Sequence, residues 1–154
     1  MSLFKNPIPI LEHDSDNKAV IMPGHSTDFH FPERAVMLFM EKESEEYAEE
    51  NNCEIIGSFT TITKVFPVYK TIHKGTEIAV CQAPLGGAAA VQIMEQLIAG
   101  GAEKIIAAGC CGALINDREG DFFIPVSALR HEGTSYHYLP PSREIDRLSF
   151  EVQQ

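Results

Sequence analysis

Hydrophobic residues in the first part of the chain form short runs of the length that strands require. Residues 18–24 end in Pro-Gly and predict a buried strand, and the apolar run 34–40 predicts a second one. The charged segment 41–52 follows, and its poor apolar stripe predicts a helix with a solvated face. The residues before position 18 are loop-like.

The middle of the chain predicts a β-hairpin followed by a strand–helix–strand crossover. β-branched and aromatic residues predict strands over 53–65, 67–73 and 76–83, with Lys74-Gly75 as the hairpin turn. A helix is expected over 88–99, because apolar residues recur there at helical spacing and two glycines follow. The expected apolar stripe consists of Val91, Met94, Leu97 and Ile98. The continuous apolar run 103–109 predicts a strand buried on both faces, parallel to the strand before the helix.

The last part of the chain predicts one more strand and a final helix. The strand is expected over 121–129, and Ser142 is a plausible N-cap for a helix that runs to the end of the sequence. A length of 154 residues suits one domain, so we expect a single domain over 1–154.

Composition and charge exclude several functional classes. A hydrophobic content of 44% allows a packed core, and a net charge of −10 disfavours binding to nucleic acid or to anionic membranes. No apolar run is long enough to span a bilayer, and the N-terminus lacks the apolar region of a signal peptide. We therefore expect a cytoplasmic protein in which the four cysteines are reduced thiols.

Three glycine-bearing turns directly follow predicted strands, at 23–26, 84–87 and 109–112. In open α/β sheets ligands bind beyond the carboxyl ends of the strands. Gly86 also precedes a helix, whose free N–H groups attract anions. Any one of these turns alone is better explained by ordinary turn formation. Three turns at the same expected edge favour a ligand site.

Two further segments carry candidate chemistry. Cys110 and Cys111 are adjacent, which disfavours a zinc site, whose ligands are usually spaced, and disfavours a strained disulfide. A catalytic thiol would need a basic partner, for which His137 is a remote candidate, and the simplest interpretation is two small side chains filling a turn. The segment 130–140 is either a polar surface loop or a site wall. Its candidate site residues are Arg130, Glu132, Thr134 and His137.

Three motifs together carry a family resemblance. The stretches "KIIAAGCCGAL" and "GDFFIPVSALRHEGTSYHY", with "VIMPG" upstream, resemble the purine nucleoside and uridine phosphorylase family from Ala19 to Glu151. The resemblance implies an α/β three-layer α/β/α fold with a mixed, partly barrel-like sheet, incomplete at the C-terminus. It also implies assembly as a homo-oligomer, either a dimer or a multiple of dimers.

The resemblance further implies cleavage of the N-glycosidic bond of nucleosides by phosphate, giving free base and ribose 1-phosphate. Phosphate and ribose contacts would stabilise the oxocarbenium-like transition state. Inorganic phosphate would be the co-substrate, with no metal and no organic cofactor. The partner would be a nucleoside or nucleobase. Together with the turns at 23–26 and 84–87, the resemblance gives candidate phosphate- or ribose-binding positions at Gly24, His25, Lys64, Gly86, Gly109 and Cys110, and it implies base-binding positions at Cys111 and Gly112.

The chain departs from this family in two ways. Two arginines that clamp phosphate in the family correspond here to Asp28 and Ala107, and family members continue with a ribose-binding Met-Glu pair beyond Gln154. The sequence thus indicates a short or truncated member whose phosphorolysis is weak or absent, with no catalytic residue assigned. The alternatives are a phosphate-independent nucleosidase and a non-catalytic nucleoside-binding or interaction module.

Overall fold

The structure, a computed structural model, describes residues 3–16, 18–25, 28–114, 116, 118–141 and 147–149. The chain divides into two compact units, one formed by residues 21–112 and the other by residues 1–20 together with 113–154. The expected single domain over 1–154 stays a prediction.

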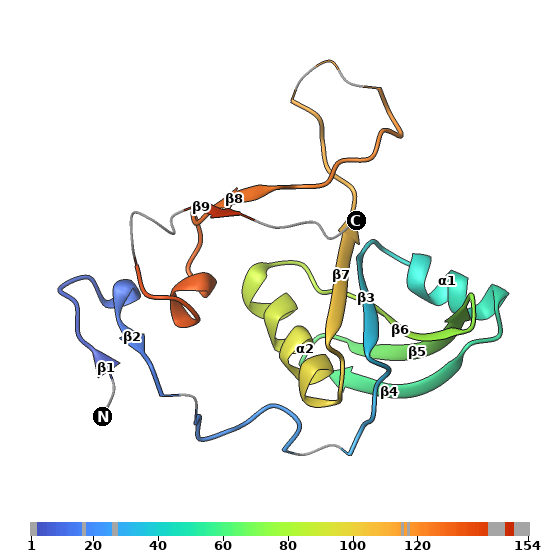
Figure 1. The fold of residues 1–154 in the computed structure, drawn as a ribbon, viewed down its shortest axis with the longest axis horizontal. Coiled ribbons are helices and arrows are strands. Elements are labelled where there is room, and N and C mark those ends of the chain that lie inside the picture. The colour runs from blue at the N-terminus through green and yellow to red at the C-terminus, as the bar shows by residue number, and fades with distance from the viewer. Residues whose placement is uncertain are drawn as a thin grey trace. The chain divides into compact units, whose positions relative to one another are not determined.

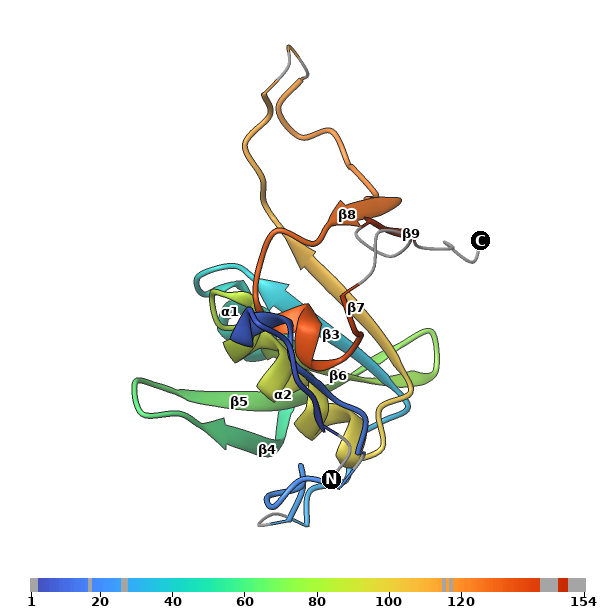
Figure 2. The same cartoon turned by 90° about the vertical axis from the view of Figure 1, so that its left-hand side faces the viewer.

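The larger unit is built on a mixed five-stranded sheet. Its strands are β3 (Arg34–Phe39), β4 (Glu54–Thr60), β5 (Val65–His73), β6 (Thr76–Gln82) and β7 (Lys104–Gly109). Their order is β4-β5-β6-β3-β7, with β3 parallel to both β6 and β7 and the other pairs antiparallel. Figures 1 and 2 show β3 and β7 side by side, pointing the same way. The sheet is open and does not close into a barrel within the described residues.

The predicted hairpin is confirmed. His73 pairs with Thr76, which leaves Lys74 and Gly75 as a two-residue loop between β5 and β6. Both loop residues have positive φ angles, 48° at Lys74 and 78° at Gly75, as a type I′ turn requires. This turn matches the right-handed twist of the flanking strands and so sets the register of β5 on β6.

One helix covers each face of the sheet. Helix α2 (Gly87–Ala99) connects β6 to β7, as the crossover prediction requires, and packs Ile93 and Leu97 against the sheet. Helix α1 (Glu43–Glu50) lies on the other face, where Tyr47 Oη hydrogen-bonds Thr71 Oγ1 at 3.0 Å. In Figure 1, β3 and β7 stand between α2 and α1. The three-layer α/β/α prediction is therefore confirmed in this unit.

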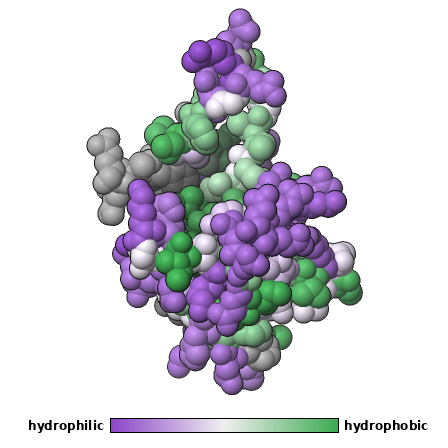
Figure 3. Space-filling view, turned by 90° about the vertical axis from the view of Figure 1, so that its right-hand side faces the viewer, coloured by the Kyte–Doolittle hydropathy of each residue, from purple (hydrophilic) through white to green (hydrophobic). Residues whose placement is uncertain are grey.

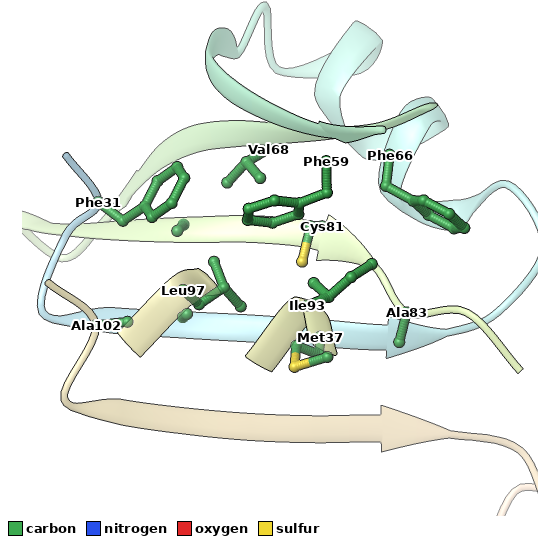
Figure 4. Packing of buried hydrophobic residues seen from close by; sticks show 12 residues of the cluster. Phe31, Met37, Phe59, Phe66, Val68, Cys81, Ala83, Ile93, Leu97 and Ala102 are labelled. Atoms are coloured by element: carbon green, nitrogen blue, oxygen red, sulfur yellow. The ribbon is translucent and has the colours of Figure 1, made fainter. Parts of the chain in front are cut away.

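The core lies between α2 and the sheet. Met37, Val68, Cys81 and Leu97 are its largest fully buried side chains. Figure 4 shows the aromatic rings of Phe31 and Phe59 on the same side of the strands as α2. The stripe that α2 buries is Ala90, Ile93 and Leu97 with Met94 packed beside it, whereas Ile98, expected in the stripe, is 55% exposed.

Two strand predictions for this unit are wrong. Residues 18–24 form no strand, and Val20 and Ile21 are exposed, because this apolar run has no sheet partner. Strand β7 forms as expected but is not buried on both faces. It pairs with β3 and forms the end of the sheet, so Ile106 is 66% exposed.

The smaller unit contains short elements. They are β1 (Leu3–Phe4), η1 (Pro9–Leu11), β2 (His13–Asp14), β8 (Ser127–Leu129), η2 (Thr134–His137) and β9 (Arg147–Ser149). Strands β1 and β2 pair antiparallel, as do β8 and β9.

Predictions for the C-terminal segment are only partly met. The strand expected over 121–129 is limited to β8, because Phe122, Phe123 and Ile124 are exposed and pair with no described strand. The final helix is wrong at 147–149, which form β9, and its expected cap, Ser142, lies outside the described residues. Among the described helices, α2 is the longest at 13 residues, and none is long and apolar enough to cross a membrane.

Candidate functional site

A cavity of about 620 Å³ opens at the carboxyl edge of the parallel strands. It lies where β3 and β6 end, beside the first turn of α2 and the loop that joins β4 to β5. Its lining residues are Phe39, Met40, Glu41, Thr61, Thr63, Lys64, Phe66, Gln82, Ala83, Pro84, Leu85, Ala89 and Gln92. A cavity of this size at this edge is typical of small-molecule sites in α/β proteins.

Lys64 is the cationic side chain of this cavity. Its Nζ donates to Gln82 Oε1 at 2.6 Å and to Glu45 Oε1 at 3.1 Å, and it lies 5.7 Å from the centroid of the Phe66 ring. The loop that carries Lys64 is closed by Thr61, whose hydroxyl donates to the Lys64 carbonyl at 2.8 Å. Lys64 is therefore positioned by its own loop, by the end of β6 and by α1.

Gln82 joins the ends of two parallel strands. Its Nε2 donates to the carbonyls of Met40 and Glu41 at 2.8 and 2.6 Å, while its Oε1 accepts from Lys64. Both N–H groups of the amide are thus used on the residues that follow β3. Gln82 therefore fixes the backbone of this turn. The atom that it turns toward Lys64 is its acceptor oxygen Oε1 and not a donor N–H group.

The cavity is acidic overall. Glu41 lines it, and Glu45 faces Lys64 from α1, so these two carboxylates outnumber the single lysine. The same helix affects Tyr69 of β5, whose pKa is raised first by burial and then by the charges of Glu45 and Glu49. Figure 3, which looks at the molecule from the α1 side, shows a mostly hydrophilic surface.

The sequence-predicted residues of the larger unit fall into two groups, and the first lies at this carboxyl edge. Lys64 lines the cavity, and Gly86, with φ 99°, is the N-cap of α2 directly after the lining residue Leu85. Gly109 ends β7 opposite Phe39, and a Cβ added to it would lie 2.9 Å from Phe39 Cβ, which explains why glycine is required there. Cys110, Cys111 and Gly112 follow directly and are exposed.

The two adjacent cysteines are free thiols. Cys110 and Cys111 are both exposed and form no disulfide. Within the described part of the chain, no group of three or more His, Cys, Asp or Glu side chains is placed to hold a metal ion. Cys110 and Cys111 directly follow β7 and both are exposed, so the interpretation that they fill a turn stays a prediction.

The second group, Gly24 and His25, lies at the opposite edge of the sheet. The Gly24 N–H donates to Gln96 Oε1 at 2.9 Å, near the C-terminal end of α2. Gly24 and Asp28 line a separate cavity of about 190 Å³ there, together with Gly100. The structure thus does not bring Gly24 or His25 together with Lys64, and the Asp28 carboxylate does not face the larger cavity.

In the smaller unit, Arg130 holds its own loop together. It is 6% exposed, and its guanidinium donates to Ser135 Oγ at 2.9 Å and to the carbonyls of Leu139 and Pro140 at 2.7 and 3.1 Å. The guanidinium also lies 4.4 Å from the centroid of the Tyr136 ring. These contacts are those of a structural arginine.

The other candidates of this loop belong to η2 or directly precede it. Glu132 accepts from the backbone N–H groups of Thr134 and Ser135 at 2.6 and 3.1 Å, and hydrogen bonds from Ser135 are the largest cause of its lowered pKa. Thr134 begins η2 and His137 ends it. Glu132 therefore accepts from two backbone N–H groups in the first turn of this short helix, whose N-cap residue is Gly133.

Sequence reasoning missed Glu41 and Gln82, which line the larger cavity, and Glu45, which pairs with Lys64. Glu41 and Glu45 belong to a charged stretch that was interpreted only as a solvated helix face. Gln82 is a polar residue at the end of an apolar strand, and that position was the one local signal of its role. Their proximity to Lys64 depends on strand order, which the sequence pattern did not specify.

Comparison with known proteins identifies the family. The family model of the phosphorylase superfamily matches residues 33–152, most of the chain, and the chain therefore belongs to this superfamily. The match begins just before β3, so Gly24 and His25 precede the family region. A search of curated proteins finds no match.

Two solved structures illustrate the similarity. A purine nucleoside phosphorylase from Toxoplasma gondii, solved in complex with immucillin-H, is 20% identical with a TM-score of 0.60, over 81% of this chain and 50% of that one. A uridine phosphorylase from Vibrio fischeri is 18% identical with a TM-score of 0.48, over 62% of this chain and 40% of that one. The Toxoplasma structure shows the shared fold. The chain spans half or less of the length of these two proteins.

Proposed function

We propose that this chain forms the nucleoside-binding region of a nucleoside phosphorylase-like protein, and that the 154-residue polypeptide alone cleaves nucleosides weakly or not at all. The observation that carries the proposal is the cavity of about 620 Å³ at the carboxyl edge of β3 and β6. Membership of the phosphorylase superfamily supports this choice of ligand class.

The cavity lining suits a ligand with one flat apolar part and one hydroxylated part. Phe39, Phe66 and Leu85 give the cavity lining its apolar side chains, which suit a base, and Leu85 is 96% exposed. Thr63 and Gln92 supply polar groups within the same cavity, which suit the hydroxyls of a ribose. A nucleoside combines these two parts in one uncharged molecule.

The weak-activity part of the proposal follows from the charges of the site. Phosphorolysis requires a dianion to be held beside the developing positive charge of the ribose, and arginine is the usual clamp for it. Among the described residues that line the cavity, Lys64 is the one cation, and Glu45 neutralises it. The second arginine position of the family is Ala107 here, as noted from the sequence.

The test is a base-release assay on the purified chain with uridine, inosine and adenosine, with and without phosphate, paired with calorimetric titration of each nucleoside. We expect saturable binding of at least one nucleoside with little or no release of base. Robust phosphorolysis would contradict the weak-activity part. Absence of binding by all three nucleosides would contradict the nucleoside-binding part.

A phosphate-independent nucleosidase is the second candidate, and the Lys64–Glu45 ion pair favours it because that pair leaves no unopposed cation for phosphate. Slow base release that is unchanged by added phosphate would support this candidate. Strict dependence on phosphate would eliminate it.

Three further expectations accompany the proposal. The protein is expected to be cytoplasmic and to use no metal or organic cofactor. It is also expected to form a homo-oligomer, and the exposed apolar edge of β7 at Ile106 is consistent with a surface that becomes covered. Light scattering of the purified chain measures the oligomeric state directly.

A further inference from the structure

Helix α1 places a carboxylate on the cation of the cavity. Its buried side, Ser44 and Ala48, packs against the sheet with 2% and 4% exposure, and the Tyr47–Thr71 hydrogen bond anchors its exposed side to β5. Glu45 follows Ser44 directly, and its Oε1 lies 3.1 Å from Nζ of Lys64 in the β4–β5 loop. The packing of α1 on the sheet thus places the Glu45 carboxylate beside the Lys64 ammonium group.

The remaining contacts of Lys64 leave little for an incoming anion. An ammonium group has three N–H donors, and here one points to Glu45 and one to Gln82 Oε1 at 2.6 Å. The Gln82 amide donates both of its N–H groups to the carbonyls of Met40 and Glu41, so it has no free donor for a bound anion. Glu41 adds a second carboxylate to the lining.

We propose that Glu45 serves as a built-in anion for Lys64 and is the residue that excludes phosphate and other anions from this cavity. The cavity then selects uncharged nucleosides over nucleotides and over phosphate. The inference rests on the proposed function in that it concerns the ligand class of the same site. It assigns to Glu45 a role in specificity that neither family membership nor the sequence pattern indicates.

The expected size of the effect follows from Coulomb's law. The side chains of Lys64 and Glu45 are 41% and 38% exposed, so water screens their charges strongly and the low end of the electrostatic range applies. Removing one negative charge at contact distance from a bound anion should then tighten its binding by about fivefold or more at low salt.

The test is titration of inorganic phosphate into ¹⁵N-labelled protein at low salt, followed by amide chemical shifts. Four proteins are compared: the wild type, Glu45→Gln, Glu50→Gln and the double variant Glu45→Gln/Lys64→Gln. Glu50 lies at the end of the same helix, is exposed and does not line the cavity, so its variant controls for the loss of one negative charge.

We expect phosphate to shift the amides of residues 61–64 in Glu45→Gln at a concentration about fivefold or more below that needed by the wild type. Glu50→Gln should bind phosphate with the same affinity as the wild type. The double variant should lose the increase in phosphate affinity seen in Glu45→Gln, which would assign that increase to Lys64. Equal phosphate affinity of the wild type and Glu45→Gln would overturn the inference, as would a gain of the same size in Glu50→Gln. A parallel titration with uridine and inosine tests the proposed function separately, because the phosphate comparison requires no nucleoside to bind.

Discussion

Replacing Leu97 with alanine tests whether the packing of α2 on the sheet holds the larger unit together. Leu97 is 0% exposed and lies within the cluster formed by α2 and the strands, facing Phe31 and Val68 in Figure 4. A fully buried Leu→Ala change costs the transfer free energy of the lost atoms plus the cavity left behind. We therefore expect the free energy of unfolding to fall by about 3–5 kcal/mol.

The neighbouring residue supplies the matched control. Ile98 is 55% exposed on the same helix turn, so Ile98→Ala removes little buried area and should change stability by about 0.5 kcal/mol or less. Urea unfolding of both variants and the wild type, followed by far-UV circular dichroism, gives the two differences directly. Equal destabilisation by the two variants would refute the packing described for α2.

Three more predictions address single features of the fold. Gly100→Ala should lower the free energy of unfolding by about 1–3 kcal/mol, because the added Cβ would lie 2.7 Å from Phe31 Cε2. The Cβ of Gly112→Ala would meet no neighbour, so this variant should leave the free energy of unfolding unchanged in the same urea titration. Arg130→Lys should make the 130–140 loop more sensitive to limited proteolysis, since lysine cannot reproduce the three directed hydrogen bonds, and an unchanged cleavage rate would contradict this. Burial raises the pKa of Cys81 from 9.0 to about 12, so the stability that this thiol confers is complete below pH 9.0 and declines as the pH rises toward about 12. Urea unfolding across that range should show this decline in the wild type and a smaller one in Cys81→Ala.

Local signals predicted much of the larger unit. The hairpin at Lys74-Gly75, helix α2 and strand β7 all follow from turn chemistry and periodicity, which act between residues close in sequence. The run 18–24 was mistaken for a strand because apolar content cannot show whether a partner strand exists. The exposure of β7 was missed for the same reason, since burial depends on the neighbours of a strand in the sheet.

The candidate site was predictable only where it depends on the ends of single elements. Gly86 and Gly109 lie at the expected edge because Gly109 ends β7 and Gly86 lies between the end of β6 and the start of α2. The Lys64–Gln82–Glu45 contacts join a loop, a strand end and a helix that are far apart in sequence, and no local pattern specifies such an arrangement. Gly24 was placed at the wrong edge because its position followed from the mistaken strand.

The most direct test of the account is an amide chemical-shift titration of the ¹⁵N-labelled chain with uridine and with inosine. We predict that the shifts gather around the larger cavity, at residues 39–41, 61–64 and 85–92. Saturable shifts confined to residues 23–31 and 96–100, which surround the smaller cavity at the opposite edge, would contradict it, as would the absence of any saturable shift.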